Sequence, residues 1–386
     1  MSRPFPDADY RSRQSAARTA LRARGLDALL IFAQESHYYL TGYDGGGYVY
    51  FQCALLTAEE TPIVLLCRRP DAAQARDTAL IDEIRIWENA EDANPAEDLR
   101  EILEQRGLRH GRVGIETDNY GLTGFNHALV QTAMEGFCDL QDASDLVRGL
   151  RLVKSDAECA LIRKAAELAD ASVEAVLQRA RPGVPDSHLT AAAMAAALEG
   201  GGDMPPAGPL VNSGRRSLYG RGVGGARELQ AVDQVVVELA ATWRRYNCCI
   251  ERTVFIGSPP APQQALFERA HDTLLAMLEL FRPGNRLGDI DVRHRELLDA
   301  AGHETHRFAA CGYSLGATYR PSWMDVPPMI YAGNPLVLEA GMVFFPHVVL
   351  ADRDQGLGVG VGETVIVTER GCERLSRLPL RLDPVL

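Results

Sequence analysis

The chain has 386 residues, 46% hydrophobic and 24% charged, which are ordinary values for a globular protein long enough to form two domains. Its formal net charge of -12 and its pI near 5.3 disfavour nucleic acid and anionic membrane surfaces as partners. Because no segment is apolar over the length of a signal peptide core or a membrane helix, we expect a soluble, cytoplasmic protein.

The first 150 residues predict an α/β domain in which helices and strands alternate. A helix over 7–25 is followed by a buried strand at 26–33. The aromatic, glycine-punctuated stretch 36–57 predicts two further strands, and helices and strands then alternate up to a last strand at 137–143. Tyr43 lies in the aromatic stretch, where tyrosines either pack in the core or line a substrate lid. We keep Tyr43 as a candidate substrate contact.

From 151 onward the pattern changes to a repeated unit of helices followed by a hairpin. Helices are predicted at 151–180 and 187–199 before a hairpin at 232–257, and at 262–281 and 286–301 before a second hairpin near 343–368. The tripeptide Arg-Pro-Gly begins at 181 and again at 282. We therefore expect domains at 1–150 and 151–386, the second an internal duplication with pseudo-twofold symmetry.

Ionisable residues occupy matching places in the two hairpins. The first carries Glu238 and Glu251 among β-branched residues; in the second, an apolar run leads to His347, a Gly/Asp-rich turn spans 351–362, and Glu363 opens the run TVIVTE. If the two halves face each other, these four side chains converge on one site. The alternative is that each one faces water at a strand edge.

Five motifs carry a family resemblance: VELA at 237–240, RRYNCCIERTVFIG at 244–257, GYSLG at 312–316, GMVFF at 341–345 and GETVIVTERG at 362–371. They resemble the creatinase, prolidase and methionine aminopeptidase superfamily, and within it ectoine hydrolase and creatinase most. YLTGYDG at 39–45 is also similar to the amino-terminal domain of ectoine hydrolase. The resemblance implies a creatinase-like α/β domain followed by a pita-bread α+β catalytic domain.

Metallopeptidases of this superfamily hold two metal ions with Asp, His and Glu ligands, and here the residue type differs at all but one of the ligand positions. The resemblance places these residues there: Glu238, Cys249, Tyr313, His347 and Glu363. A dinuclear site needs several bridging carboxylates. We therefore expect neither a metal nor another cofactor. The alternative is one zinc or iron ion held by Glu238, Cys249, His347 and Glu363.

The remaining roles combine residue chemistry with the resemblance to creatinase. His347 titrates nearest to neutral pH and is our candidate general base. The resemblance makes Glu251 and Glu363 clamps for a guanidinium-like group, and it places an arginine, Arg221, where creatinase has its catalytic histidine. Tyr313 is a candidate oxyanion donor.

Other side chains are candidate substrate contacts, each with a structural alternative. Glu238 either acts with the other acids or pairs with Arg252. Arg221 and Arg320 could each bind a substrate carboxylate. Cys249 is either a nucleophile or a small buried thiol.

These observations favour a metal-independent hydrolase that cleaves a C–N bond of an amidine, guanidino or amide group in a small zwitterion. Three alternative functions stay open. A prolidase-like Xaa-Pro metallopeptidase with altered ligands, a catalytically silent small-molecule-binding protein, and a lyase or cyclase fit the same residues. The resemblance further implies a homodimer in which the amino-terminal domain of one subunit closes the site of the other.

Overall fold

The computed structural model describes residues 3–381 and 384–385. It divides into two compact units, Met1–Arg151 and Leu152–Leu386. The elements of the first unit are α1 (Asp7–Arg24), β1 (Ala28–Ile31), α2 (Gln34–Thr41), the 3-10 helix η1 (Gly47–Val49), β2 (Cys53–Thr57), β3 (Val64–Arg68), α3 (Arg69–Thr78), β4 (Glu83–Trp87), α4 (Pro95–Gln105), β5 (Arg112–Ile115), α5 (Gly124–Met134), β6 (Asp139–Asp142) and α6 (Ser144–Leu150).

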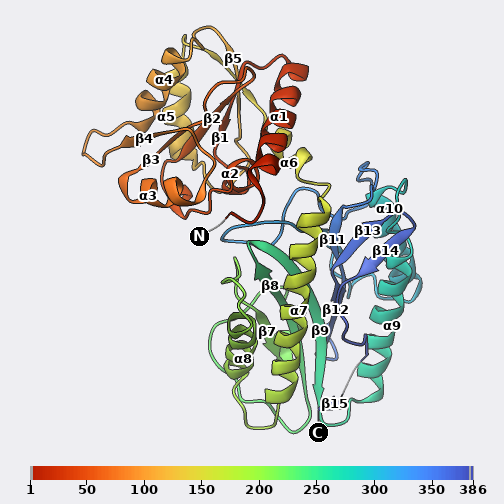
Figure 1. Ribbon diagram of the computed structural model, residues 1–386. Helices are drawn as coiled ribbons and strands as arrows, with labels where there is room; N and C mark the ends of the chain where they lie inside the picture. The colour runs from red at the N-terminus through yellow and green to blue at the C-terminus, as the bar shows by residue number, and fades with distance from the viewer. Residues whose placement is uncertain (1–2, 382–383, 386) are drawn as a thin grey trace. The chain divides into compact units, whose positions relative to one another are not determined.

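The first unit is a six-stranded mixed sheet covered by helices on both faces (Figure 1). Its strand order is β4-β3-β2-β1-β5-β6, with β1 antiparallel to β2 and parallel to β5. Because successive residues of a strand point to opposite faces, Leu30 packs with α4 and α5, whereas Leu29 and Ile31 pack with α1, α3 and α6. This arrangement confirms the predicted α/β amino-terminal domain.

The aromatic stretch after β1 forms a helix, α2, where we expected a strand. Gly42 ends this helix with a left-handed backbone (φ 77°) whose N–H donates to the Tyr38 carbonyl. The helix turns Tyr38 and Leu40 into the core of the unit. Packing of this face against the sheet outweighs the strand preference of the aromatic residues.

The second unit contains α7 (Asp156–Arg179), α8 (Asp186–Glu199), β7 (Leu210–Ser213), the 3-10 helix η2 (Gly214–Leu218), β8 (Asp233–Trp243), β9 (Tyr246–Ile256), α9 (Ala261–Leu278), α10 (Leu287–Ala300), β10 (Gly312–Ser314), β11 (Val343–Asp352), β12 (Leu357–Glu363), β13 (Val365–Thr368), β14 (Gly371–Arg374) and β15 (Pro384–Val385). The main strand order is β14-β13-β11-β12-β9-β8-β7, so the strands of the two hairpins meet at β12 and β9.

Each half of the second unit consists of two helices followed by a hairpin, as the repeated pattern predicted. The helix α7 packs along β8 and β9, and α9 packs along β11 and β12 (Figure 1). In the second half, apolar residues of α9, α10, β11 and β12 form one buried cluster. The helices therefore cover one face of the joined hairpins. Among the described residues, no helix is both long and apolar enough to span a bilayer.

The second hairpin differs from its prediction. Residues 357–362, which we expected to lie in a turn, belong to the strand β12. Glu363 ends this strand, whereas we expected it to open the next one. The alternating sequence GVGVG suggested a turn because glycine is rare in strands. Here Gly360 and Gly362 face crowded side chains of neighbouring strands, and Gly358 faces Ser217 of η2, which explains why this strand contains glycines.

Candidate functional site

Four residues form one row across adjacent strands of the second unit. Glu238 of β8 lies opposite Glu251 of β9, Glu251 lies opposite Gly362 of β12, and Gly362 lies opposite His347 of β11. Directly opposed residues in antiparallel strands project their side chains to the same face. The row therefore brings two carboxyl groups and one imidazole, from both halves of the fold, onto a single face.

The turn of the first hairpin fixes the register of this row. Arg244 and Arg245 form a two-residue loop, and both adopt left-handed backbone angles, with φ of 51° and 67°. Such loops match the twist of antiparallel strands and permit one pairing of the flanking residues. Because a slip of one residue would turn a side chain to the opposite face, this turn decides that Glu238 and Glu251 share a face.

Two glycines of β12 make room for the site. A Cβ at Gly360 would collide with Glu251 Oε1, and a Cβ at Gly362 would come within 2.5 Å of Phe345 Cζ and 2.8 Å of His347 Cβ. Any larger residue would therefore displace the two side chains that flank this strand. Sequence reasoning missed these glycines as part of the site, although their alternate spacing in a strand was a visible signal.

Glu251 and His347 face each other with unused hydrogen-bonding capacity. Glu251 Oε2 lies 3.7 Å from His347 Nδ1, which is too long for a direct hydrogen bond. Both atoms are buried, and neither has a hydrogen-bonding partner in the described part of the chain. A polar group placed between them could bond to both. Burial lowers the pKa of His347 to about 3, so its imidazole is neutral at pH 7 and does not titrate near neutral pH as the sequence led us to expect.

The two carboxyl groups of the row favour a shared proton. Burial, reinforced by the neighbouring Glu238 charge, raises the pKa of Glu251 well above its ordinary value. Burial also raises the pKa of Glu238. Two adjacent carboxylates in a poorly solvated site do not both ionise readily. Both groups therefore favour the protonated form more than free carboxyl groups do, and binding of a cation would favour release of a proton.

Tyr313 and Trp323 hold one of these carboxyl groups in place. The Tyr313 hydroxyl donates to Glu238 Oε1 at 2.8 Å and accepts a hydrogen bond from Trp323 Nε1, also at 2.8 Å. Cys249 Sγ lies 3.7 Å from the same hydroxyl. The Tyr313 proton is thus directed at Glu238. Trp323 lies in an irregular segment, and no sequence pattern marked it.

Glu363 does not converge with the other acids, contrary to our expectation. It lies opposite Ile250, one residue out of step with Glu251, so its side chain points to the other face of the sheet. There it is fully buried and forms an ion pair with Arg252. This ion pair also replaces the pairing of Arg252 with Glu238 that we considered from the sequence.

The remaining candidates lie in different surroundings. Arg221 is exposed, and its charge lowers the pKa of Glu238, which places it near one end of the row. Arg320 is exposed on the segment that leads to Trp323. Cys249 is fully buried, and burial raises the pKa of its thiol well above the ordinary value, which disfavours the nucleophilic thiolate.

Tyr43 lies in the core of the first unit, which corrects its assignment as a substrate contact. Its side chain is fully buried, and its hydroxyl donates to Gln52 Oε1 at 3.2 Å.

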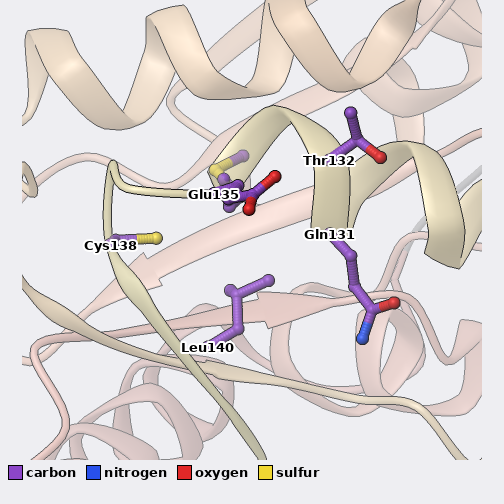
Figure 2. Close-up of a pocket in the computed structure, with 6 residues that line it drawn as sticks. Gln131, Thr132, Glu135, Cys138 and Leu140 are labelled. Atoms are coloured by element: carbon purple, nitrogen blue, oxygen red, sulfur yellow. The ribbon is translucent and has the colours of Figure 1, made fainter.

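The first unit also has a cavity of about 350 Å³, whose lining residues are shown in Figure 2. The cavity is lined by Gln131, Thr132, Met134, Glu135, Cys138 and Leu140. Burial raises the pKa of the Cys138 thiol to about 11, so this cavity offers no activated nucleophile.

Comparison with known proteins identifies the family. Residues 160–369 match the model of metallopeptidase family M24, and residues 13–153 match the creatinase/prolidase N-terminal domain. The chain belongs to metallopeptidase family M24. Together the two matches confirm the resemblance and the order of domains that the sequence motifs predicted. The chain is accordingly assigned to the M24 hydrolases.

Relatives of this M24 chain differ in the reactions that their names state. It is 30% identical to an ectoine hydrolase of Halomonas elongata, over 99% of this chain and 98% of the relative. It is 26% identical to an Xaa-Pro dipeptidase of Pyrococcus furiosus, over 68% of this chain and 74% of the relative. The structure of dipeptidase PepE from Mycobacterium ulcerans has a TM-score of 0.85 at 24% identity, covering 99% of both chains, and supports the fold alone.

The donors of this M24 chain do not fit a pair of bridged metal ions. The row presents Gly362 to the site where Glu363 was expected, which leaves too few carboxylates to bridge two cations. Burial raises the pKa values of the Cys249 thiol and the Tyr313 hydroxyl well above their ordinary values, so both keep the protons that a metal would have to displace.

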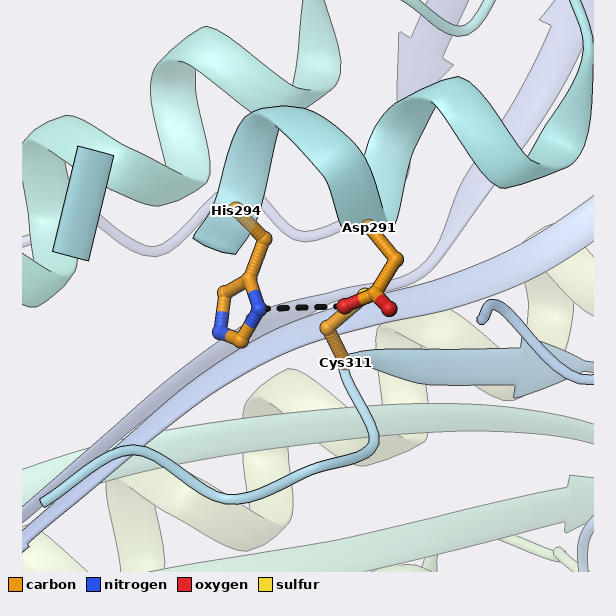
Figure 3. Close-up of side chains that lie close together, drawn as sticks. All are labelled: Asp291, His294 and Cys311. Atoms are coloured by element: carbon orange, nitrogen blue, oxygen red, sulfur yellow. Dashed lines mark hydrogen bonds and ion pairs between the residues drawn. The ribbon is translucent and has the colours of Figure 1, made fainter. Parts of the chain in front are cut away.

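A different group of metal-binding residue types lies together in the second unit: Asp291, His294 and Cys311, whose ligand atoms lie within 4.8 Å of one another (Figure 3). Both carboxylate oxygens of Asp291 already have partners. Asp291 Oδ1 lies 3.2 Å from His294 Nδ1, and Oδ2 accepts hydrogen bonds from Arg295 Nε and the Ala332 amide, both at 2.8 Å. These contacts explain the group as a hydrogen-bonded part of the core.

Proposed function

We propose that this M24 hydrolase cleaves a C–N bond in a cationic amidine or guanidino group of a small zwitterion, without a metal ion. The observation that carries this proposal is the facing pair of unpartnered atoms, Glu251 Oε2 and His347 Nδ1, 3.7 Å apart beside a second carboxyl group. Acids that share a proton suit a cationic group, and a neutral imidazole suits activation of water. The similarity to an ectoine hydrolase supports the same class of bond.

In the proposed reaction, His347 removes a proton from water as the water oxygen attacks the amidine carbon. The electrons of the C=N bond move to nitrogen, and the resulting tetrahedral intermediate expels one nitrogen when the C–N bond breaks. The carboxyl pair of Glu238 and Glu251 releases its proton when the cation binds and holds the substrate N–H groups. The imidazolium of His347 returns the proton taken from water to the leaving nitrogen, and the hydroxyl oxygen of the intermediate loses its remaining proton to the released amine as the C=O bond forms. Arg221, at the exposed end of the row, binds the carboxylate of the zwitterion.

Metal independence and substrate class are tested together. Purified protein is assayed against cyclic amidines such as ectoine and against creatine, with and without EDTA, after elemental analysis for first-row transition metals. We expect turnover of at least one of these compounds that EDTA leaves unchanged. Turnover of Xaa-Pro dipeptides that requires added Mn²⁺ or Co²⁺, with none of the amidines, would instead establish a metallopeptidase.

Two further points belong to this proposal. We propose a homodimer in which the amino-terminal domain of one subunit covers the site of the other, and analytical ultracentrifugation tests for the dimer.

The catalytically silent alternative predicts saturable binding of a small zwitterion with no product in prolonged incubations. Product formation by the wild-type chain, abolished in His347→Gln, would reject that alternative.

A further inference from the structure

The row of site residues depends on a short junction between the two halves of the second unit. Glu251 belongs to the first hairpin and His347 to the second, and β9 and β12 join the hairpins. The backbone ladder of this junction, which we call the seam, consists of the pairs Gly362↔Glu251 and Glu363↔Ile250. By contrast, the β8–β9 ladder runs the full length of its hairpin, from Asp233↔Ile256 to Trp243↔Tyr246.

Side chains extend the seam on both sides of this short ladder. Thr253 Oγ1 donates to the Gly360 carbonyl and accepts from the Gly360 amide, both at 2.9 Å. At the other end, Thr364 Oγ1 accepts from the Cys249 amide at 2.9 Å and donates to the Cys249 carbonyl at 2.6 Å. Hydroxyl groups thus replace the backbone pairing that the strands no longer provide.

Arg252 bridges the seam from the face opposite the site. Its Nη1 donates to the backbone carbonyls of Glu251 and Gly362, each at 2.9 Å. These are the two facing members of the row. Its Nη2 donates to Glu363 Oε1 and, at 3.2 Å, to Ser376 Oγ. One planar guanidinium therefore holds both strands at the point where the site crosses from one half to the other.

Glu363 makes this buried arginine possible. The side chains of Arg252 and Glu363 are 5% and 0% exposed, and a buried guanidinium without a counter-ion would be strongly unfavourable. The network continues from Ser376 Oγ to Asp170 Oδ1 of α7 at 2.6 Å. The helix layer is thereby connected to the seam.

We propose that Arg252 and Glu363 are positioning residues that set the separation of Glu251 and His347 across the seam. They touch no substrate, and their effect on catalysis is transmitted through the backbone of Glu251 and Gly362. The catalytic part of this inference rests on the proposed function. The structural part, that the pair fixes the seam, stands without it.

The test compares Arg252→Lys and Glu363→Gln with a matched control, Arg163→Lys. Arg163 forms a forked ion pair with Glu373 in the same unit, but 47% and 38% of these side chains are exposed. A lysine at 252 keeps the charge but cannot reach all the acceptors of the guanidinium. We expect Arg252→Lys to lower kcat/KM at least about 100-fold, mainly through kcat, because small displacements of reacting groups have effects of this size.

Glu363→Gln keeps the side-chain shape, and we expect a smaller loss in the same direction. The control should remain within about 3-fold of the wild type. A folded Arg252→Lys variant with wild-type kcat/KM would overturn the catalytic part, even if its Tm were lower. If Arg252→Lys does not fold, a folded Glu363→Gln variant with wild-type kcat/KM would overturn it equally.

Hydrogen–deuterium exchange provides a readout that does not depend on turnover. We expect peptides covering 248–254 and 358–364 to exchange faster in Arg252→Lys and Glu363→Gln than in the wild type, and at the wild-type rate in Arg163→Lys. Unchanged exchange in both seam variants would reject the structural part. If the wild type turns over no amidine, the proposed function fails, and the exchange result still decides whether the pair fixes the seam.

Discussion

At the scale of single residues, chemistry depends on the protonation states of a few buried groups. Burial keeps His347 neutral and favours a proton on the carboxyl pair of Glu238 and Glu251. The free site thus places a neutral imidazole beside carboxyl groups that favour the protonated form, and a bound cation would reverse that preference. Tyr313 and Trp323 then fix one carboxyl group by hydrogen bonds.

Replacing His347 by glutamine should remove the general base without opening a large cavity. We expect kcat to fall by about 10²- to 10⁴-fold, the usual contribution of such a base, with a Tm close to that of the wild type. Steady-state kinetics and calorimetry measure the two quantities. Glu251→Gln should show a comparable loss. The surface variant Glu373→Gln is the control, and a His347→Gln variant with full activity would exclude His347 as the base.

Binding of an amidinium should displace the proton held by the carboxyl pair. Because the pKa of Glu251 is raised in the free protein and a bound cation favours the carboxylate, binding at pH 7 should release up to about one proton. Titration calorimetry with acetamidinium in buffers of different ionisation enthalpy measures this number. Glu251→Gln should bind with no such release. Equal apparent enthalpies in all buffers for the wild type would contradict the prediction.

At the scale of the elements, two hairpins and the glycines of β12 decide which side chains meet. Gly360 and Gly362 provide the clearance for Glu251 and His347, and the two-residue turn at Arg244 sets the register of the first hairpin. A strand rich in glycine is intrinsically weak. Here the long ladder with β11 supports it on one side, from His347↔Gly362 to Asp352↔Leu357.

Gly360→Ala should inactivate the protein because the new methyl group would occupy the space of Glu251 Oε1. We expect kcat/KM to fall at least about 100-fold, as for other displacements of a reacting group, with a lower Tm from overpacking. Gly371→Ala on β14 is the matched control, since its Cβ would meet no heavy atom within 4 Å. Similar activities in the two variants would argue against the clearance role of Gly360.

At the scale of the whole molecule, stability includes a buried acid far from the site in sequence. Glu116 accepts hydrogen bonds from the Phe32 and Ala33 amides and from Ser36 Oγ near the start of α2. Burial nevertheless raises its pKa from 4.5 to about 7. The folded first unit therefore takes up a proton that the unfolded chain releases between these values.

This raised pKa predicts a pH dependence of stability with a definite sign. The contribution of Glu116 is fully present below pH 4.5 and is lost as pH rises through 7. Relative to Glu116→Gln, the wild type should lose about 2–3 kcal/mol between pH 5 and 8. Urea unfolding can be followed by Trp87 of the first unit, with Trp243 and Trp323 replaced by phenylalanine in both chains. Parallel curves for the two chains would contradict the prediction.

The sequence by itself determined the family, the domain order and the duplicated helix-and-hairpin plan, because motif spacing and hydrophobic periodicity are local properties of the chain. It also singled out Glu238, Glu251 and His347. Tertiary structure alone decided that Glu363 turns away and that Tyr43 lies in a core. A strand changes the face of every side chain with a register shift of one residue, and the register of β9 with β12 depends on contacts between segments about a hundred residues apart. Arg252 and Trp323 act through such contacts, so only the folded chain reveals their positions.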